Sequence, residues 1–246
     1  MHVFNNGYRL SAEWARKSGN KARYEECFKE LKTEMAKLKY GDTFEYGHYI
    51  LAGGSDPVDI EIHSPIKWRV LEVRSDSVIL AITDEPLYWD CYHGSYKFRE
   101  RKDINWRDSD IRKELNGKKY DQWFSECEKK AILETRVEED GIVTGDRLFL
   151  LSIEECKRYL PAIDDRIVVT HFVDKLTDEP IEISLVPQSW WLRSKAEGGD
   201  YSEVGMISGV FETGNIDCEE GFECTADELG VRPAMWIDVN KIESLI

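Results

Sequence analysis

The sequence lacks the features that direct a chain into or across a membrane. No apolar run approaches the roughly 20 residues that a transmembrane helix needs, and the first residues show no basic segment followed by an apolar one. No Asn-x-Ser/Thr sequon occurs, and the six cysteines are scattered, unlike the disulfide framework of a small secreted chain. We therefore expect a cytoplasmic protein with free thiols, no leader peptide and no membrane partner.

Positive charge is also scarce. The formal net charge of −15 at pH 7 repels a phosphate backbone, so nucleic acid is not expected as a partner. The one basic cluster, Lys97–Lys102, is interrupted by Glu100 and followed by Asp103. We interpret it as a solvated loop.

Motifs that carry catalysis or cofactors are missing too. The five histidines show no metal-ligand spacing, and Gly53-Gly54-Ser55 lacks the Lys-Ser/Thr of a phosphate-binding loop. No Gly-x-Ser-x-Gly nucleophile motif occurs. The acidic clusters Glu138-Glu139-Asp140 and Asp164-Asp165 are expected to be solvated turns. The sequence thus predicts no cofactor and favours a protein that is not an enzyme.

The first 39 residues differ in pattern from the rest and are expected to form a helical extension to a domain spanning residues 40–246. An apolar stripe at helical spacing predicts an amphipathic helix; its members are Tyr24, Phe28, Leu31, Met35 and Leu38. Such a stripe permits a coiled-coil homodimer, and it equally permits packing against the main domain. Both alternatives remain open at this point.

The main domain begins and ends with strand patterns. Pro65–Val73 alternates polar and apolar residues and turns into Val78–Ile82, which predicts a hairpin. The other expected strands are Thr43–Tyr46, His48–Leu51, Arg147–Leu151, Trp190–Arg193, Val204–Ser208, Val210–Glu212 and Val231–Ile237. Sheet, helices and sheet again, with few strand–helix–strand units, indicate an α+β class.

Three short helices are expected between these strands. The first runs from about Ser109 to Asn116, with Gly117 at its C-terminal cap. The other two begin at capping boxes, in which a serine is followed three residues later by a glutamate: Ser125 with Glu128, and Ser152 with Glu155.

The order of several motifs resembles a family of bacterial and phage domains of unknown function over about residues 40–240. The motifs are Gly41-Asp42-Thr43-Phe44, Pro65-Ile66-x-Trp68-Arg69-Val70, Leu148–Glu155, Trp190-Trp191-Leu192-Arg193-Ser194 and Gly230-Val231-Arg232-Pro233-Ala234. The resemblance implies a C-type-lectin-like fold, shared with formylglycine-generating enzymes, with mixed or antiparallel sheets and short helices. The segments after Ser194 and before Gly230 depart from the family pattern.

The conspicuous candidates for ligand binding are Trp190, Trp191, Arg193 and Arg232. The tryptophans could form a stacking platform and the arginines could clamp an anion or carboxylate. We favour a core role instead, because Trp-Trp-Leu is how a strand fills both faces of a sheet. The loops Tyr88–Tyr96 and Ser194–Asp200, together with Tyr92 and Tyr201, are the places where a ligand is expected.

Cys218 and Cys224 carry the alternative. Gly-Phe-x-Cys-x-Ala-Asp resembles the closing strand of formylglycine-generating enzymes, where two cysteines bind copper, and two thiolates suit Cu(I). The segment from Asp217 to Leu229 is instead interpreted as an acidic excursion. We expect a non-enzymatic binding or interaction module for a protein or small molecule; the alternative is a thiol- or copper-dependent oxidase.

Overall fold

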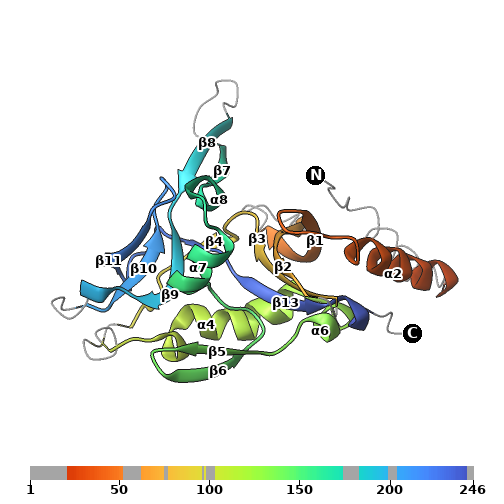
Figure 1. Ribbon diagram of the computed structural model, residues 1–246, viewed down its shortest axis with the longest axis horizontal. Helices are drawn as coiled ribbons and strands as arrows, with labels where there is room; N and C mark the ends of the chain where they lie inside the picture. The colour runs from red at the N-terminus through yellow and green to blue at the C-terminus, as the bar shows by residue number, and fades with distance from the viewer. Residues whose placement is uncertain are drawn as a thin grey trace, which may run out of the picture.

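The computed structural model describes residues 21–51, 62–74, 77–95, 97, 103–173, 183–198 and 204–242. It confirms the α+β class: mostly antiparallel strands form two larger sheets with short helices around them (Figure 1). Among the described residues, no helix is long and apolar enough to cross a membrane.

The first sheet has four antiparallel strands in the order β1-β2-β3-β13. They are β1 (Thr43–Leu51), β2 (Ile62–Val73), β3 (Val78–Thr83) and β13 (Ala234–Asp238). The predicted β2–β3 hairpin is confirmed. The two strands expected around Gly47 are one strand, whose pairing with β2 shifts register between Glu45 and His48. Gly47 has φ +72° there, so the glycine allows a bulge rather than ending the strand.

The second sheet has five strands in the order β11-β10-β9-β12-β4. They are β11 (Ile216–Glu223), β10 (Met206–Val210), β9 (Trp190–Lys195), β12 (Gly230–Val231) and β4 (Tyr88–Trp89). The prediction of two strands over 204–212 is wrong, because the chain turns at Phe211–Gly214. The acidic segment from Asp217 is also not an excursion, since most of it lies in β11 and pairs with β10.

Two consecutive strand pairs connect the two sheets. The β3–β13 pair of the first sheet continues as the β4–β12 pair of the second. Between them Thr83 N donates to Pro233 O at 3.0 Å, and Leu87 N donates to Val231 O at 3.0 Å. The expected single strand Val231–Ile237 is therefore two strands in different sheets. Pro233 has no N–H to continue a ladder, and the chain bends there. We call the bend, Thr83–Asp84 with Arg232–Pro233, the corner.

The capping boxes are confirmed. Ser125 begins α6 (Glu126–Ala131) and Ser152 begins α7 (Ile153–Tyr159). The prediction that Gly117 ends the first helix is wrong. α4 (Asp110–Glu114) runs on through η2 (Leu115–Lys119) into α5 (Tyr120–Trp123), and Gly117, at φ −119° and ψ −109°, bends it. The sequence alone does not distinguish a glycine at a helix end from a glycine at a helix kink.

Two further hairpins were not predicted. The first joins β5 (Thr135–Glu139) to β6 (Ile142–Asp146) through Asp140 and Gly141. Both turn residues have positive φ, as a tight hairpin turn requires.

The prediction of a strand over Arg147–Leu151 is wrong. This segment makes only a single bridge, between Phe149 and Ala234.

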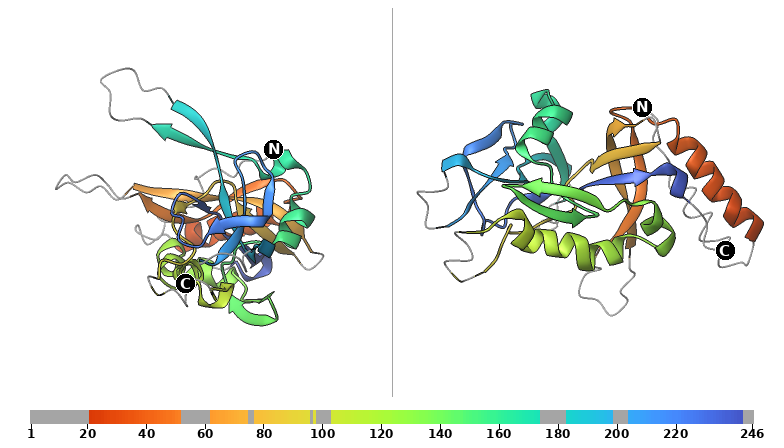
Figure 2. Two further views of the ribbon diagram at one scale, coloured as in Figure 1. Left: turned by 90° about the vertical axis from the view of Figure 1, so that its left-hand side faces the viewer. Right: turned by 60° about the horizontal axis from the view of Figure 1, so that its bottom comes forward.

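The second hairpin pairs β7 (Val168–Val173) with β8 (Ile183–Gln188). It forms a two-stranded ribbon that projects from the body of the molecule, beyond α8 (Ile163–Arg166) (Figure 2). Among the described strands no third one pairs with it. We call it the projecting ribbon.

The predicted N-terminal helix is present as α2 (Lys21–Met35) and packs against the main domain. Met35 and Leu38 are buried in the common core, with Phe28 and Leu31 packed on it. Lys32 Nζ donates to Asn240 O at 2.7 Å, in η4 (Val239–Lys241). Much of the apolar stripe is thereby used within one chain, although a homodimer through this helix stays a prediction. The side chain of Tyr24 lies outside the described ones.

Candidate functional site

The tryptophans of the Trp-Trp-Leu-Arg-Ser motif are core residues. Trp190 and Trp191 lie in β9 and are fully buried. Trp190 Nε1 donates to Arg166 O at 3.1 Å, and Trp191 Nε1 donates to Asp90 O at 2.9 Å. Tyr92 is equally buried, and its hydroxyl donates to Arg193 O at 3.0 Å. These three rings present no open face to a ligand in this structure. Tyr201 lies outside the described residues.

Arg193 is held in a closed cluster. Its Nε donates to Glu139 Oε2 at 2.8 Å, and its Nη1 donates to Leu150 O at 2.7 Å and to Glu155. Burial raises the pKa of Glu139, opposed by a hydrogen bond from Ser194 and by the charge of Arg193. The interpretation of Glu139 as part of a solvated turn is therefore wrong. Two carboxylates compensate this guanidinium, which leaves little for an external anion to add.

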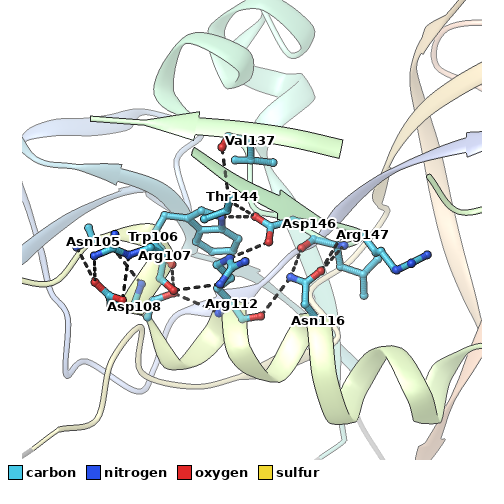
Figure 3. Close-up of polar contacts among 12 residues, drawn as sticks. Asn105, Trp106, Arg107, Asp108, Arg112, Asn116, Val137, Thr144, Asp146 and Arg147 are labelled. Carbon is cyan, nitrogen blue, oxygen red and sulfur yellow. Dashed lines mark hydrogen bonds and ion pairs between the residues drawn. The ribbon is translucent and has the colours of Figure 1, made fainter. Parts of the chain in front are cut away.

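A second closed cluster surrounds Asp146 and was not predicted (Figure 3). Its buried carboxylate accepts hydrogen bonds from Trp106 Nε1 at 2.8 Å, Thr144 Oγ1 at 2.6 Å and Arg112 Nε at 2.7 Å. The donors come from three elements, and no local motif brings them together. All the contacts are internal, so this cluster fixes β6 against η1 (Trp106–Asp108) and α4.

Arg232 differs from both. It is fully buried at the corner, with Nε donating to Thr83 O at 2.7 Å and Nη2 to Asp84 O at 3.4 Å. Its guanidinium also lies 4.9 Å from the Trp190 ring centroid. Neither hydrogen bond is to a carboxylate, and Nη1 has no hydrogen-bond partner among the described residues. Of the predicted site residues that the structure describes, this side chain alone leaves a buried donor unused.

The two cysteines of the oxidase alternative are not arranged as a copper pair. Asp217, beside Cys218, pairs with Gly209 of β10, whereas Cys224 N donates to Gly205 O at 2.9 Å. Four residues of an extended strand separate those two positions, which is about 13 Å. Two sulfurs on one metal lie within about 4.6 Å of each other. Within the described part of the chain, no group of three or more His, Cys, Asp or Glu could hold a metal ion.

The first predicted ligand loop lies against β9, which leads into the second loop, and its contacts are mostly made by buried groups. Asp90 and Tyr92 bond to β9, and His93 N donates to Cys224 O at 2.8 Å. In the second loop Ser194 and Ala196 are buried. The large exposed side chain of this region is Trp89, which is 44% exposed.

Trp89 belongs to an apolar surface around the base of the projecting ribbon. Eight large hydrophobic side chains are exposed among the described residues, and five of them gather there: Trp89, Ile163, Val169, Val186 and Phe211. We call these five residues the ribbon-base surface. They come from β4, α8, β7, β8 and the turn after β10, so the sequence places them far apart.

Hydrogen bonds fix these segments to one another. Trp89 Nε1 donates to Gln188 Oε1 at 3.0 Å, and Gln188 Nε2 donates to Val186 O at 3.2 Å. On the other side, Ser189 Oγ donates to Glu212 Oε2 at 2.8 Å, next to Phe211. The surface is thus displayed on anchored chain. Of the five residues, Trp89 fell within a loop expected from the sequence to carry function. The other four residues of the ribbon-base surface were not predicted. The apolar runs of β7 and β8 were the sequence signal that could have indicated them.

Comparison with known proteins gives one result. The sequence profile of a family described as Domain of unknown function (DUF6273) matches residues 73–239, which is more than half of the chain. No curated protein and no solved structure gives a significant match.

Proposed function

We propose that this chain, which belongs to the DUF6273 family, is a non-catalytic interaction module that binds a protein partner at the ribbon-base surface. The observation that carries the proposal is the gathering of five exposed apolar side chains around one projecting ribbon. Exposed apolar side chains that cluster on a folded protein mark interaction sites, and here they lie on both faces of the ribbon and beside its base.

Trp89 is the expected anchor of the interface. Tryptophan contributes more to binding than most residues because it buries a large area and keeps one hydrogen-bonding group. Trp89 Nε1 is already held by Gln188, which orients the ring before binding. A preoriented side chain loses little entropy when a partner covers it.

The projecting ribbon is expected to gain stability from a partner. A two-stranded hairpin is marginally stable alone in water, and Val169 and Val186 are each 38% exposed on adjacent strands. Val169 pairs with Pro187 and Val186 with Thr170, so the two valines lie on opposite faces of the ribbon. We infer a partner that contacts both faces. Because the chain carries a net charge of −15, the partner is expected to have a basic rim around its apolar contact.

Site-specific photo-cross-linking tests this proposal. A benzophenone amino acid is placed at Trp89 or, as a control, at Val143, which is equally exposed but lies on β6 in another sheet. A protein adduct is expected from position 89 alone, and Val186→Glu should abolish it. Identical adducts from both positions, or an adduct that survives Val186→Glu, would refute the ribbon-base surface as the interface.

We also propose that the fold is C-type-lectin-like and the location cytoplasmic. An antiparallel sheet and a mixed sheet with short helices, together with the parallel contact of Gly230 in the closing strand with Trp190, support the first. The second rests on the six cysteines, none of which forms a disulfide in the structure. An experimental structure should superpose on lectin-like domains over both sheets.

A further inference from the structure

The corner joins a buried cation to a surface pair of cations. Arg232 is next to Asp84, whose side chain binds two other groups: Lys67 Nζ lies 2.7 Å from Oδ2, and Arg69 Nη2 lies 3.1 Å from Oδ1. Three cations therefore share one carboxylate. Burial opposes ionisation of Asp84, but the hydrogen bond from Lys67 and the charges of Arg69, Lys67 and Arg232 outweigh it and lower the pKa.

The cluster keeps an excess of positive charge even when its other acidic neighbour is counted. Glu45 pairs with Lys67 across β1 and β2. Burial raises the pKa of Glu45, opposed by Lys67. With Asp84 and Glu45 both ionised, the three cations still exceed the carboxylates by one charge. This excess lies inside a chain whose net charge is −15.

The unused donor is Nη1 of Arg232. A buried charge without a counter-ion destabilises the folded state, and so does a buried N–H of a charged group without an acceptor. Burial, followed by the like charge of Arg69, lowers the pKa of Arg232 to about 9. A buried water would accept one hydrogen bond but would leave the charge excess uncompensated.

We propose that the corner binds one small anion, of the size of chloride, at Nη1 of Arg232, a side chain that Asp84 links to the cation pair Lys67–Arg69. The size follows from burial, because Arg232 is fully enclosed and Nη1 is not accessible to solvent. Lys67 and Arg69, whose side chains are 39% and 31% exposed, are the solvent-exposed cations of this cluster. The site is separate from the ribbon-base surface and does not depend on the proposed function.

The anion would stabilise the bend between the two sheets. It adds the missing counter-charge to the guanidinium that holds Thr83 O and Asp84 O. Stability should therefore rise with halide concentration at constant ionic strength. With halide at ten times its dissociation constant, the Tm should exceed that in gluconate, an anion too large for the site, by roughly 3–6 °C.

Two surface variants test the charge argument without altering Arg232, whose replacement is expected to unfold the corner. Arg69→Gln removes one cation and should weaken the halide dependence several-fold. Asp84→Asn removes the carboxylate and should strengthen it several-fold, although it destabilises the protein. Arg107→Gln, at an exposed arginine paired with Asp108, is the control and should leave the halide dependence unchanged.

Crystals of the full chain soaked in bromide give the direct measurement. An anomalous peak beside Nη1 of Arg232 is expected, and its height should fall in Arg69→Gln. A water-only corner, with no anomalous peak and with a Tm that follows ionic strength alone, would overturn the proposal. So would equal halide dependence in Arg69→Gln and Asp84→Asn.

Discussion

Two buried arginines of the same motif set show how far partners decide the role of a residue. Arg193 is compensated by Glu139 and Glu155, whereas Arg232 binds only carbonyl oxygens and an aromatic face. The sequence identifies both arginines, but Glu139 lies 54 residues from Arg193. A contact over that separation is set by the fold and has no local signal.

Breaking the Arg193 cluster is expected to be costly. Arg193→Met leaves two carboxylates beside an apolar side chain, and removing one member of a buried ion pair typically costs about 3–5 kcal/mol. Arg136→Met is the matched control, because Arg136 and Glu138 form an exposed pair at 2.8 Å in β5, the strand that also carries Glu139. Such surface pairs contribute about 0–1 kcal/mol. Urea unfolding measures both; equal losses would contradict the closed-cluster description.

At the scale of the element, Gly47 and Gly41 separate backbone strain from steric conflict. Both have positive φ, +72° and +82°. A Cβ at Gly41 would meet nothing within 4 Å, whereas a Cβ at Gly47 would lie 2.5 Å from the Phe124 ring. The bulge of β1 is thus packed against Phe124, the residue that follows α5.

Alanine at these two positions should therefore differ in effect. Gly41→Ala should lose roughly 1–2 kcal/mol of the free energy of unfolding, the cost of a left-handed backbone with a Cβ. Gly47→Ala adds an overpacking cost of typically 1–3 kcal/mol. Thermal and urea denaturation give both values, and a loss at Gly41 equal to that at Gly47 would argue against a tight β1–Phe124 contact.

The elements that the sequence predicted are those defined by neighbours along the chain. Capping boxes and the β2–β3 hairpin depend on residues a few positions apart, so Ser152 and Glu155 could be identified directly. The strand over 231–237 could not be divided correctly, since the bend at Pro233 is set by which sheet each half joins. The ribbon-base surface depends on five segments meeting and was visible only through Trp89.

At the scale of the whole molecule, the corner, where the β3–β13 pair continues as the β4–β12 pair, predicts that the two sheets unfold together. β3 and β13 belong to the first sheet, β4 and β12 to the second, and the residues between them are hydrogen-bonded. Fluorotryptophan labelling reports on each sheet separately, through Trp68 in β2 and Trp190 in β9. One common urea midpoint is expected. Two separate midpoints would show that the corner does not couple the sheets.

The corner also gives the chain an unusual connectivity. β3 and β13 are neighbours in one sheet, so everything from Asp84 to Pro233 is an insertion between two adjacent strands. The two ends of this insertion are held together by the hydrogen bond from Thr83 N to Pro233 O and by those from Arg232 to Thr83 O and Asp84 O. Lengthening a loop whose ends are already fixed costs little, because closure entropy grows only with the logarithm of length. Changes in the length of its surface loops should therefore leave the register of β3 and β13 unchanged, while the shared core keeps the body of the insertion on the first sheet.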